Sequence, residues 1–211
     1  MSMESTFFIA VDLAQVNDYT VFTIIERIIT YVPERVRGYT YASEKGREYH
    51  LRHIERSERG TPYPKIVERL KELIYSKQLI GKQKAVVIDV TGVGMPVWDM
   101  IQAAGLKRQI NGIQITGGNN VTWNDNIYNV PKRDLISALQ VAFQNGALKI
   151  AQGLPEAETL VRELTNFKVK ININGHDQYE AWREGIHDDI VLSAAMGVWL
   201  AAQRRRCKMI Y

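Results

Sequence analysis

The residues Gly185-Ile186-His187-Asp188-Asp189-Ile190-Val191, close to the end of the 211-residue chain, place two adjacent carboxylates directly before an apolar run. From Ile190 onward, apolar residues recur at steps of three and four, which predicts a helix with Asp188 and Asp189 at its N-terminus. The apolar positions are Ile190, Val191, Ala194, Ala195, Val198, Trp199 and Ala202. Free N–H groups and the helix dipole stabilise acids at such a place, so helix capping is the structural interpretation of this pair.

Two carboxylates far upstream favour a chemical role instead. Asp12 ends the apolar run that starts at Phe7, and Asp89 ends the run that starts at Lys84. Both runs are too short for a helix and rich in strand formers, so we expect two buried strands that each finish in an acid. Acids delivered from two strand ends and one helix start can converge on a metal ion, although either strand-end acid alone could equally belong to a turn.

The composition indicates a soluble globular protein of one domain. The chain has 211 residues, of which 45% are hydrophobic and 24% charged. No apolar run reaches the roughly 18 residues of a membrane span, and the first residues lack the pattern of a signal peptide, so we expect a cytosolic protein. The single cysteine, Cys207, excludes an internal disulfide and leaves oxygen atoms as the metal ligands. The net charge of +4 permits a polyanionic partner.

The order of expected elements gives the fold class. A strand at 7–12 and a segment at 19–32 should pair antiparallel, and a third strand is expected at 39–42 or 48–54, with Ser43-Glu44-Lys45-Gly46 as a turn. Helices and strands then alternate, and we find no linker that would divide residues 1–211 into two domains. The later elements are a helix after Pro62, a strand at 84–89, a helix at 96–104, a strand at 110–115, a loop at 116–129, a helix at 131–145, an extended piece at 147–150, a helix at 155–166 and a hairpin at 167–182.

Three antiparallel strands followed by alternating helices and parallel strands are the plan of the ribonuclease H-like fold, an α/β fold with a central mixed sheet flanked by helices. Three motifs occur in the expected order: Val11-Asp12-Leu13-Ala14, Ile88-Asp89-Val90-Thr91-Gly92-Val93-Gly94 and Gly185-Ile186-His187-Asp188-Asp189. With the hairpin at 167–182 before the last motif, nearly the whole chain resembles the nuclease domain of the large terminase subunit of tailed bacteriophages, a RuvC-like nuclease.

This resemblance implies a metal-dependent endonuclease that cuts double-stranded viral DNA concatemers during genome packaging. Two Mg²⁺ or Mn²⁺ ions would activate water and stabilise the leaving oxygen. We expect Asp12 to bridge the ions because its strand end is the middle of the fold, with Asp89 on one ion and Asp188 or Asp189 on the other. Asp18 is a further candidate ligand, and capping of its turn is the alternative.

Other polar residues have weaker claims. His187 could orient a carboxylate or contact the phosphate, and a structural role at the helix start is the competing interpretation. Basic residues could bind DNA phosphates without reading sequence, although each could equally be a solvated surface charge. The candidates for DNA contact are Lys132, Arg133, Lys168, Lys170, Arg183 and the stretch 47–59.

The chain departs from the complete family protein in one respect. It contains no Gly-x4-Gly-Lys-Ser/Thr motif, so we expect no ATPase motor domain within it and cleavage without ATP. The resemblance implies that the terminase motor domain, the small terminase subunit and the portal are partners, that no membrane is involved, and that the protein acts in the cytoplasm of an infected bacterial host.

Two other function classes stay open. Thr91-Gly92-Val93-Gly94 could bind nucleotide phosphates, as in actin-like ATPases and sugar kinases, but no second phosphate loop follows a later hairpin. A catalytically silent DNA-binding module could also keep the fold, and the acids at every expected position argue against it.

Overall fold

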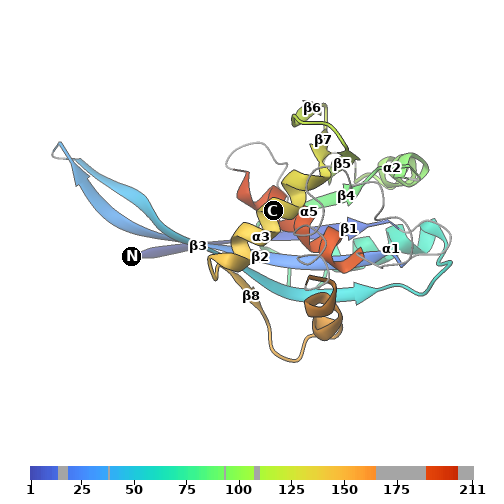
Figure 1. Ribbon diagram of the computed structural model, residues 1–211, viewed down its shortest axis with the longest axis horizontal. Helices are drawn as coiled ribbons and strands as arrows, with labels where there is room; N and C mark the ends of the chain where they lie inside the picture. Colours follow the sequence, from blue (N-terminus) through green and yellow to red (C-terminus); the bar gives the residue numbers. More distant parts are fainter. Residues whose placement is uncertain (14–18, 38, 93, 107–109, 165–188, 204–211) are drawn as a thin grey trace, which may run out of the picture.

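The computed structural model describes residues 1–13, 19–37, 39–92, 94–106, 110–164 and 189–203. Its centre is one eight-stranded sheet with the strand order β6-β7-β5-β4-β1-β2-β3-β8 (Figure 1). Strands β1 (Ser2–Asp12), β2 (Val21–Val36) and β3 (Tyr39–Arg56) form the expected antiparallel meander. Every described residue of β1 from Phe8 to Val11 is fully buried, as a central strand with both faces covered requires.

The other half of the sheet is parallel. Strand β4 (Lys84–Asp89) runs beside β1 in the same direction, followed outward by β5 (Ile110–Thr116) and β7 (Ile127–Pro131). A short antiparallel strand, β6 (Thr122–Asn124), forms one edge, and β8 (Leu148–Ile150) pairs parallel with β3 at the other edge. The carboxyl ends of β1, β4, β5 and β7 therefore meet at one end of the sheet.

Helices cover both faces. Helices α3 (Lys132–Gln144) and α5 (Asp189–Ala202) share a core with Phe8 and Ala10 of β1, and residues 157–164, which are also helical, reach this core through Leu160. Helices α1 (Tyr63–Ile74) and α2 (Gly94–Ala103) share the opposite core with Ile9 and Val11. The strand alternation thus assigns each side chain of β1 to one layer or the other. No helix in the described parts of the chain is long and apolar enough to cross a membrane.

The third strand differs from the expectation. Both expected positions, 39–42 and 48–54, belong to the single strand β3, and the expected turn at Ser43–Gly46 is wrong. The chain reverses at Arg37, which has a φ of 50°. The register shifts where Thr30 faces Gly46 and Tyr31 faces Glu44, so Lys45 is an extra residue in β3. The polar, glycine-containing sequence that indicated a turn is explained by this bulge.

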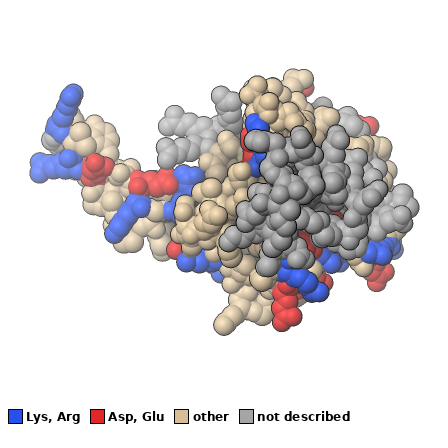
Figure 2. Space-filling view, in the orientation of Figure 1, with Lys and Arg blue, Asp and Glu red and all other residues tan. Residues whose placement is uncertain are grey.

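A ribbon of β2 and β3 extends beyond the start of β1. The last pairing of β1 joins Ser2 to Tyr31, so residues 32–36 and 39–43, which we call the arm, form a two-stranded ribbon beyond the three-stranded region. The arm projects from the sheet at the end where the N-terminus lies (Figure 1), and basic side chains are visible at that end (Figure 2). The basic residues here are Arg35 in the arm and Arg37, where the chain reverses. It lies at the opposite end of β1 from Asp12.

Two further differences from the expected fold concern where strands begin. The expected loop at 116–129 contains β6 and the start of β7, which form a hairpin whose connection includes Asp125 with a φ of 51°. Strand β1 starts at Ser2 rather than at Phe7, because Ser2 to Thr6 pair with β2 although their sequence is polar. The expected hairpin at 167–182 lies outside the described residues.

Candidate metal site and nucleic-acid interface

Asp12 and Asp89 lie side by side at the carboxyl ends of two adjacent parallel strands. The register pairs Val11 of β1 with Ile88 of β4, and each acid is the next residue on its strand. Ile88 and Val11 belong to the α1/α2 core, so alternation directs both acids to the face that α3 and α5 cover. Each is only 8% exposed. Two nearly buried carboxylates on neighbouring strand ends are a costly arrangement unless cations or hydrogen bonds compensate them.

Helix α5 brings Asp189 to the same end of the sheet. The Ser193 hydroxyl lies 2.9 Å from that of Thr23 and donates to the carbonyl of Ala10 at 3.2 Å. One helical turn earlier is Asp189, which is buried and is the first residue of α5. The other end of α5 lies near Arg27, which pairs with Thr6 far from Asp12. The helix therefore runs antiparallel to β1, and its N-terminus lies at the acid end.

The N-terminus of α5 is fixed by an acid that the sequence analysis missed. The backbone N–H of Val191 donates to Glu163 Oε2 at 3.2 Å, and Arg56 Nη2 donates to Glu163 Oε1 at 2.5 Å. Glu163 is 7% exposed. A carboxylate at a free helix N–H group is stabilised by that donor and by the helix dipole. Nothing in the local spacing of residues 157–164 marks Glu163, because its partners lie in β3 and α5.

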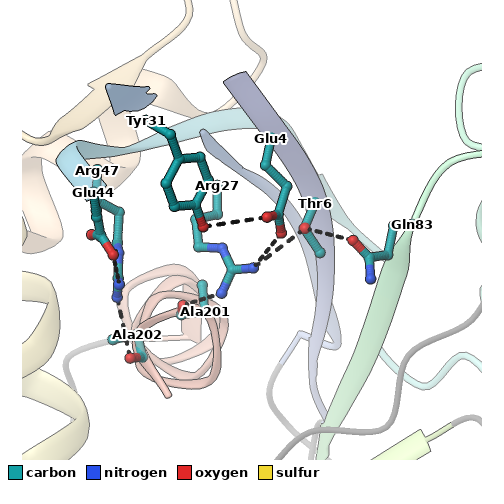
Figure 3. Close-up of polar contacts among 9 residues, drawn as sticks. All are labelled: Glu4, Thr6, Arg27, Tyr31, Glu44, Arg47, Gln83, Ala201 and Ala202. Atoms are coloured by element: carbon teal, nitrogen blue, oxygen red, sulfur yellow. Dashed lines mark hydrogen bonds and ion pairs between the residues drawn. The ribbon is translucent and has the colours of Figure 1, made fainter. Parts of the chain in front are cut away.

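The opposite end of α5 is fixed by two arginines (Figure 3). Arg27 Nη1 donates to the carbonyl of Ala201 at 3.0 Å, and Arg47 Nη1 donates to that of Ala202 at 3.3 Å. Arg27 also reaches Thr6 at 3.4 Å and Glu4 at 3.5 Å. Cations at a helix C-terminus satisfy carbonyls that have no partner within the helix. Both ends of the helix that carries Asp189 are thus held by charged side chains from other elements.

The surroundings of Asp89 identify a cation near the acids. Burial raises the pKa of this carboxyl, while hydrogen bonds from Thr91 and the positive charge of Lys132 oppose the rise. The N–H of Thr91 donates to Asp89 Oδ1 at 2.7 Å. Lys132 is the first residue of α3, directly after β7. Lys132, which we proposed as a DNA contact, therefore lies close enough to Asp89 to favour the ionised form of that carboxyl.

Arg133 has a different environment. Its Nη2 donates to the carbonyl of Asn119 at 2.9 Å, which ties the start of α3 to the loop after β5, and its Nε lies 3.4 Å from Asp134. The side chain is 45% exposed. The two adjacent basic residues thus differ: Lys132 is electrostatically coupled to an acid, and Arg133 supports a loop at the same end of the sheet.

The basic stretch 47–59 lies mostly in β3, where Arg47 contacts the end of α5 and Arg56 contacts Glu163. The remaining candidates lie outside the described residues. These are Asp18, Lys168, Lys170, Arg183, His187 and Asp188. Within the described residues, no group of three or more His, Cys, Asp and Glu side chains forms a ready metal cage. The described structure brings Asp12 and Asp89 together and directs the start of α5 to the same end, without showing a coordination geometry.

Comparison with known proteins gives the family. A family model described as the terminase RNaseH-like domain matches residues 9–197. The chain belongs to this family. The nuclease domain of the human cytomegalovirus terminase has a similar structure, with a TM-score of 0.54 and 12% sequence identity over 94% of this chain and 84% of that one. No curated protein sequence matches the chain significantly.

The terminase family match confirms the fold that the motif order predicted. The chain has the ribonuclease H-like α/β fold, with a mixed sheet between two helical layers. The matched residues include Asp12, Asp89 and Asp189, so the family model spans the three candidate metal ligands that the structure describes. Membership supports a nuclease role in packaging over the actin-like and sugar-kinase alternative.

Proposed function

We propose that this terminase-family chain is an endonuclease that cleaves double-stranded DNA with two bound Mg²⁺ or Mn²⁺ ions. The observation that supports the proposal is the delivery of buried carboxylates to one end of the sheet from three separate elements. Asp12 and Asp89 come from adjacent strand ends, and Asp189 comes from the start of α5. A fold gains no stability from bringing like charges together, so this arrangement is best explained by a cationic ligand.

The donor set fits hard divalent ions. Mg²⁺ and Mn²⁺ prefer oxygen ligands, and all the candidate ligands are carboxylates. In the proposed assignment, Asp12 would be shared by the two ions, Asp89 would help to hold one, and Asp188 or Asp189 the other. The bound ions would activate the attacking water and stabilise the leaving oxygen. The proposal rests on the donor chemistry and on the shared end of the sheet.

The substrate side of the proposal rests on charge and on family. Lys132 lies near Asp89, where it can hold a phosphate beside the acids, and Arg133 follows it on the same helix start. We extend the proposal to concatemer cutting during packaging, to a motor domain, small terminase subunit and portal as partners, and to the cytoplasm of an infected bacterium. These come from the family resemblance.

Plasmid cleavage tests the proposed function. The wild-type protein should nick and linearise plasmid DNA with Mn²⁺ or Mg²⁺ and should be inactive in EDTA. Asp12→Asn should reduce the rate by at least about a hundredfold, because it removes one charge from the ion site at nearly constant volume. The matched control is Asp99→Asn on the exposed surface of α2, which should cleave like the wild type.

The outcomes separate the nuclease from a silent DNA-binding module. Full activity in EDTA would exclude the metal mechanism. Normal activity of Asp12→Asn would exclude the assigned ligands. Duplex binding without cleavage under any metal condition would favour the silent module, which keeps the fold without the chemistry.

A further inference from the structure

Trp123 lies in the same transverse row of the sheet as the acids. The strand register pairs Asp89 with Ile113, Ile113 with Tyr128, and Tyr128 with Trp123. Residues directly opposite each other in a sheet share a face, and Ile113 and Tyr128 belong to the α3/α5 core. The row therefore has Asp89 at one end and Trp123 at the other, with both side chains on the face of α3 and α5.

Burial along this row changes abruptly. Asp89 is 8% exposed, Ile113 is fully buried and Tyr128 is 2% exposed, whereas Trp123 is 56% exposed. Its strand, β6, has only three residues, all exposed, at the edge of the sheet. A large aromatic side chain left in water at a polar edge is typical of residues that anchor an interaction, because burial of its surface on binding is favourable.

The distance along the row suits duplex DNA. Three strand spacings of about 4.8 Å separate Asp89 from Trp123, which gives about 14 Å. The major groove of B-DNA is about 12 Å wide. We consider a duplex that has its scissile phosphate at the acids and its axis parallel to the row. The sugar–phosphate backbone on the other side of its major groove would then lie close to Trp123.

The residues between the two ends supply compatible contacts. The loop after β5 and the start of α3 lie at this end of the sheet, since Thr116 pairs with Pro131. Arg133 ties them together through the carbonyl of Asn119. Basic and amide groups therefore flank the row: residues 116–123 contain no acid, and the exposed Asp125 follows in the connection between β6 and β7.

We infer that Trp123 is a DNA-contacting residue that packs against a deoxyribose of the strand across the groove from the cut. This inference rests on the proposed function for its choice of ligand. The contact is apolar, so it holds the duplex in register over the acids without neutralising a phosphate.

The experiment measures binding of a fluorescent duplex by anisotropy in EDTA, where no cleavage occurs, over a series of salt concentrations. Trp123→Ala should weaken binding about 5- to 100-fold at every salt concentration and should leave the slope of log K against log salt unchanged. Trp123→Phe should recover most of the affinity, because it restores an aromatic surface. A loss caused only by local unfolding would appear as a lower melting temperature and would not be rescued in this way.

Tyr39→Ala is the matched control. Tyr39 is an aromatic residue with 69% exposure on the arm, at the far end of the sheet, and its replacement should not change binding. The inference would be overturned if Trp123→Ala bound the duplex as tightly as the wild type does. It would also be overturned if the salt slope changed and Trp123→Phe did not restore binding, or if the wild-type protein bound no duplex. If the protein binds duplex through Trp123 but never cleaves it, the proposed nuclease function is contradicted and this inference stands. If the protein cleaves DNA but Trp123→Ala binds duplex as the wild type does, this inference is contradicted and the proposed function stands.

Discussion

Replacement of Arg27 by Met should strongly destabilise the protein, because this guanidinium is buried at the C-terminus of α5. Arg27 is 8% exposed and donates to the carbonyl of Ala201 at 3.0 Å and to Thr6 Oγ1 at 3.4 Å. It also lies over the ring of Phe8, 5.3 Å from the centroid. Met fills much of the same volume but has no donor, so the carbonyl of Ala201 loses this partner in a buried place.

The magnitude follows from these contacts. The hydrogen bond from a charged donor contributes about 1.5–3 kcal/mol, and a cation at a helix C-terminus about 0.3–1 kcal/mol. The ion pair with Glu4 adds little, because Glu4 is 45% exposed and the separation is 3.5 Å. We therefore expect Arg27→Met to lower the free energy of unfolding by about 2–4 kcal/mol. For a chain of this size that corresponds to a melting temperature about 4–16 °C lower.

Thermal denaturation followed by circular dichroism measures this effect. The matched control is Arg52→Met, which removes a pairing with Glu26 at 2.7 Å from a side chain that is 44% exposed. An exposed ion pair contributes less than about 1 kcal/mol, so this variant should melt close to the wild type. Equal melting temperatures for Arg27→Met and Arg52→Met would refute the buried role of Arg27.

Three other substitutions give independent tests. Asp89→Asn should stabilise the metal-free protein near neutral pH and flatten the pH dependence of its stability. The reason is that burial raises the pKa of the wild-type carboxyl, so the wild type loses stability as pH rises through that pKa. Mn²⁺ should raise the melting temperature of the wild type and not of this variant. Gly197→Ala should lower stability by no more than about 2 kcal/mol in a urea titration, because a Cβ there would lie 2.9 Å from Ile25 Cδ1 of the buried core, and the overpacking cost is partly offset by the about 0.5–1 kcal/mol that Ala gains over Gly inside a helix. Lys132→Ala should slow plasmid cleavage about tenfold or more and reduce the salt slope of duplex binding by about one, while unchanged kinetics would remove Lys132 from the site.

The sequence predicted those parts of the fold that local pattern determines. The apolar runs ending in Asp12 and Asp89 are buried strands, and the helix beginning at the acid pair is α5, because short apolar runs and a three-to-four periodicity report burial directly. The length of β3 could not be predicted in this way. Its residues 39–46 are mostly exposed, and they are held in a strand by pairing with β2 rather than by burial.

The same distinction between local pattern and distant contacts applies to the residues of the candidate site. Asp12 and Asp89 were found because each ends a recognisable strand. Glu163 and Arg27 were missed because each has a partner more than a hundred residues away in the sequence: Glu163 contacts Arg56, and Arg27 contacts Ala201. Trp123 was missed because β6 lies inside a stretch whose Gly and Asn content predicted a loop. Such relations depend on topology, which the local sequence does not record.

The two ends of α5 are coupled by the stiffness of the helix itself. Its 14 residues span about 21 Å at 1.5 Å per residue. Arg27 and Arg47 hold one end, and Glu163 holds the N–H of Val191 at the other, next to Asp189. Gly197 lies between them, where the absence of a side chain lets the helix approach Ile25 and Ala10 of the sheet. Because these contacts hold both ends of one helix, we expect a change at Arg27 or Gly197 to shift Asp189 as well. Close packing between these clamps therefore contributes to the position of the third acid as well as to the stability of the fold.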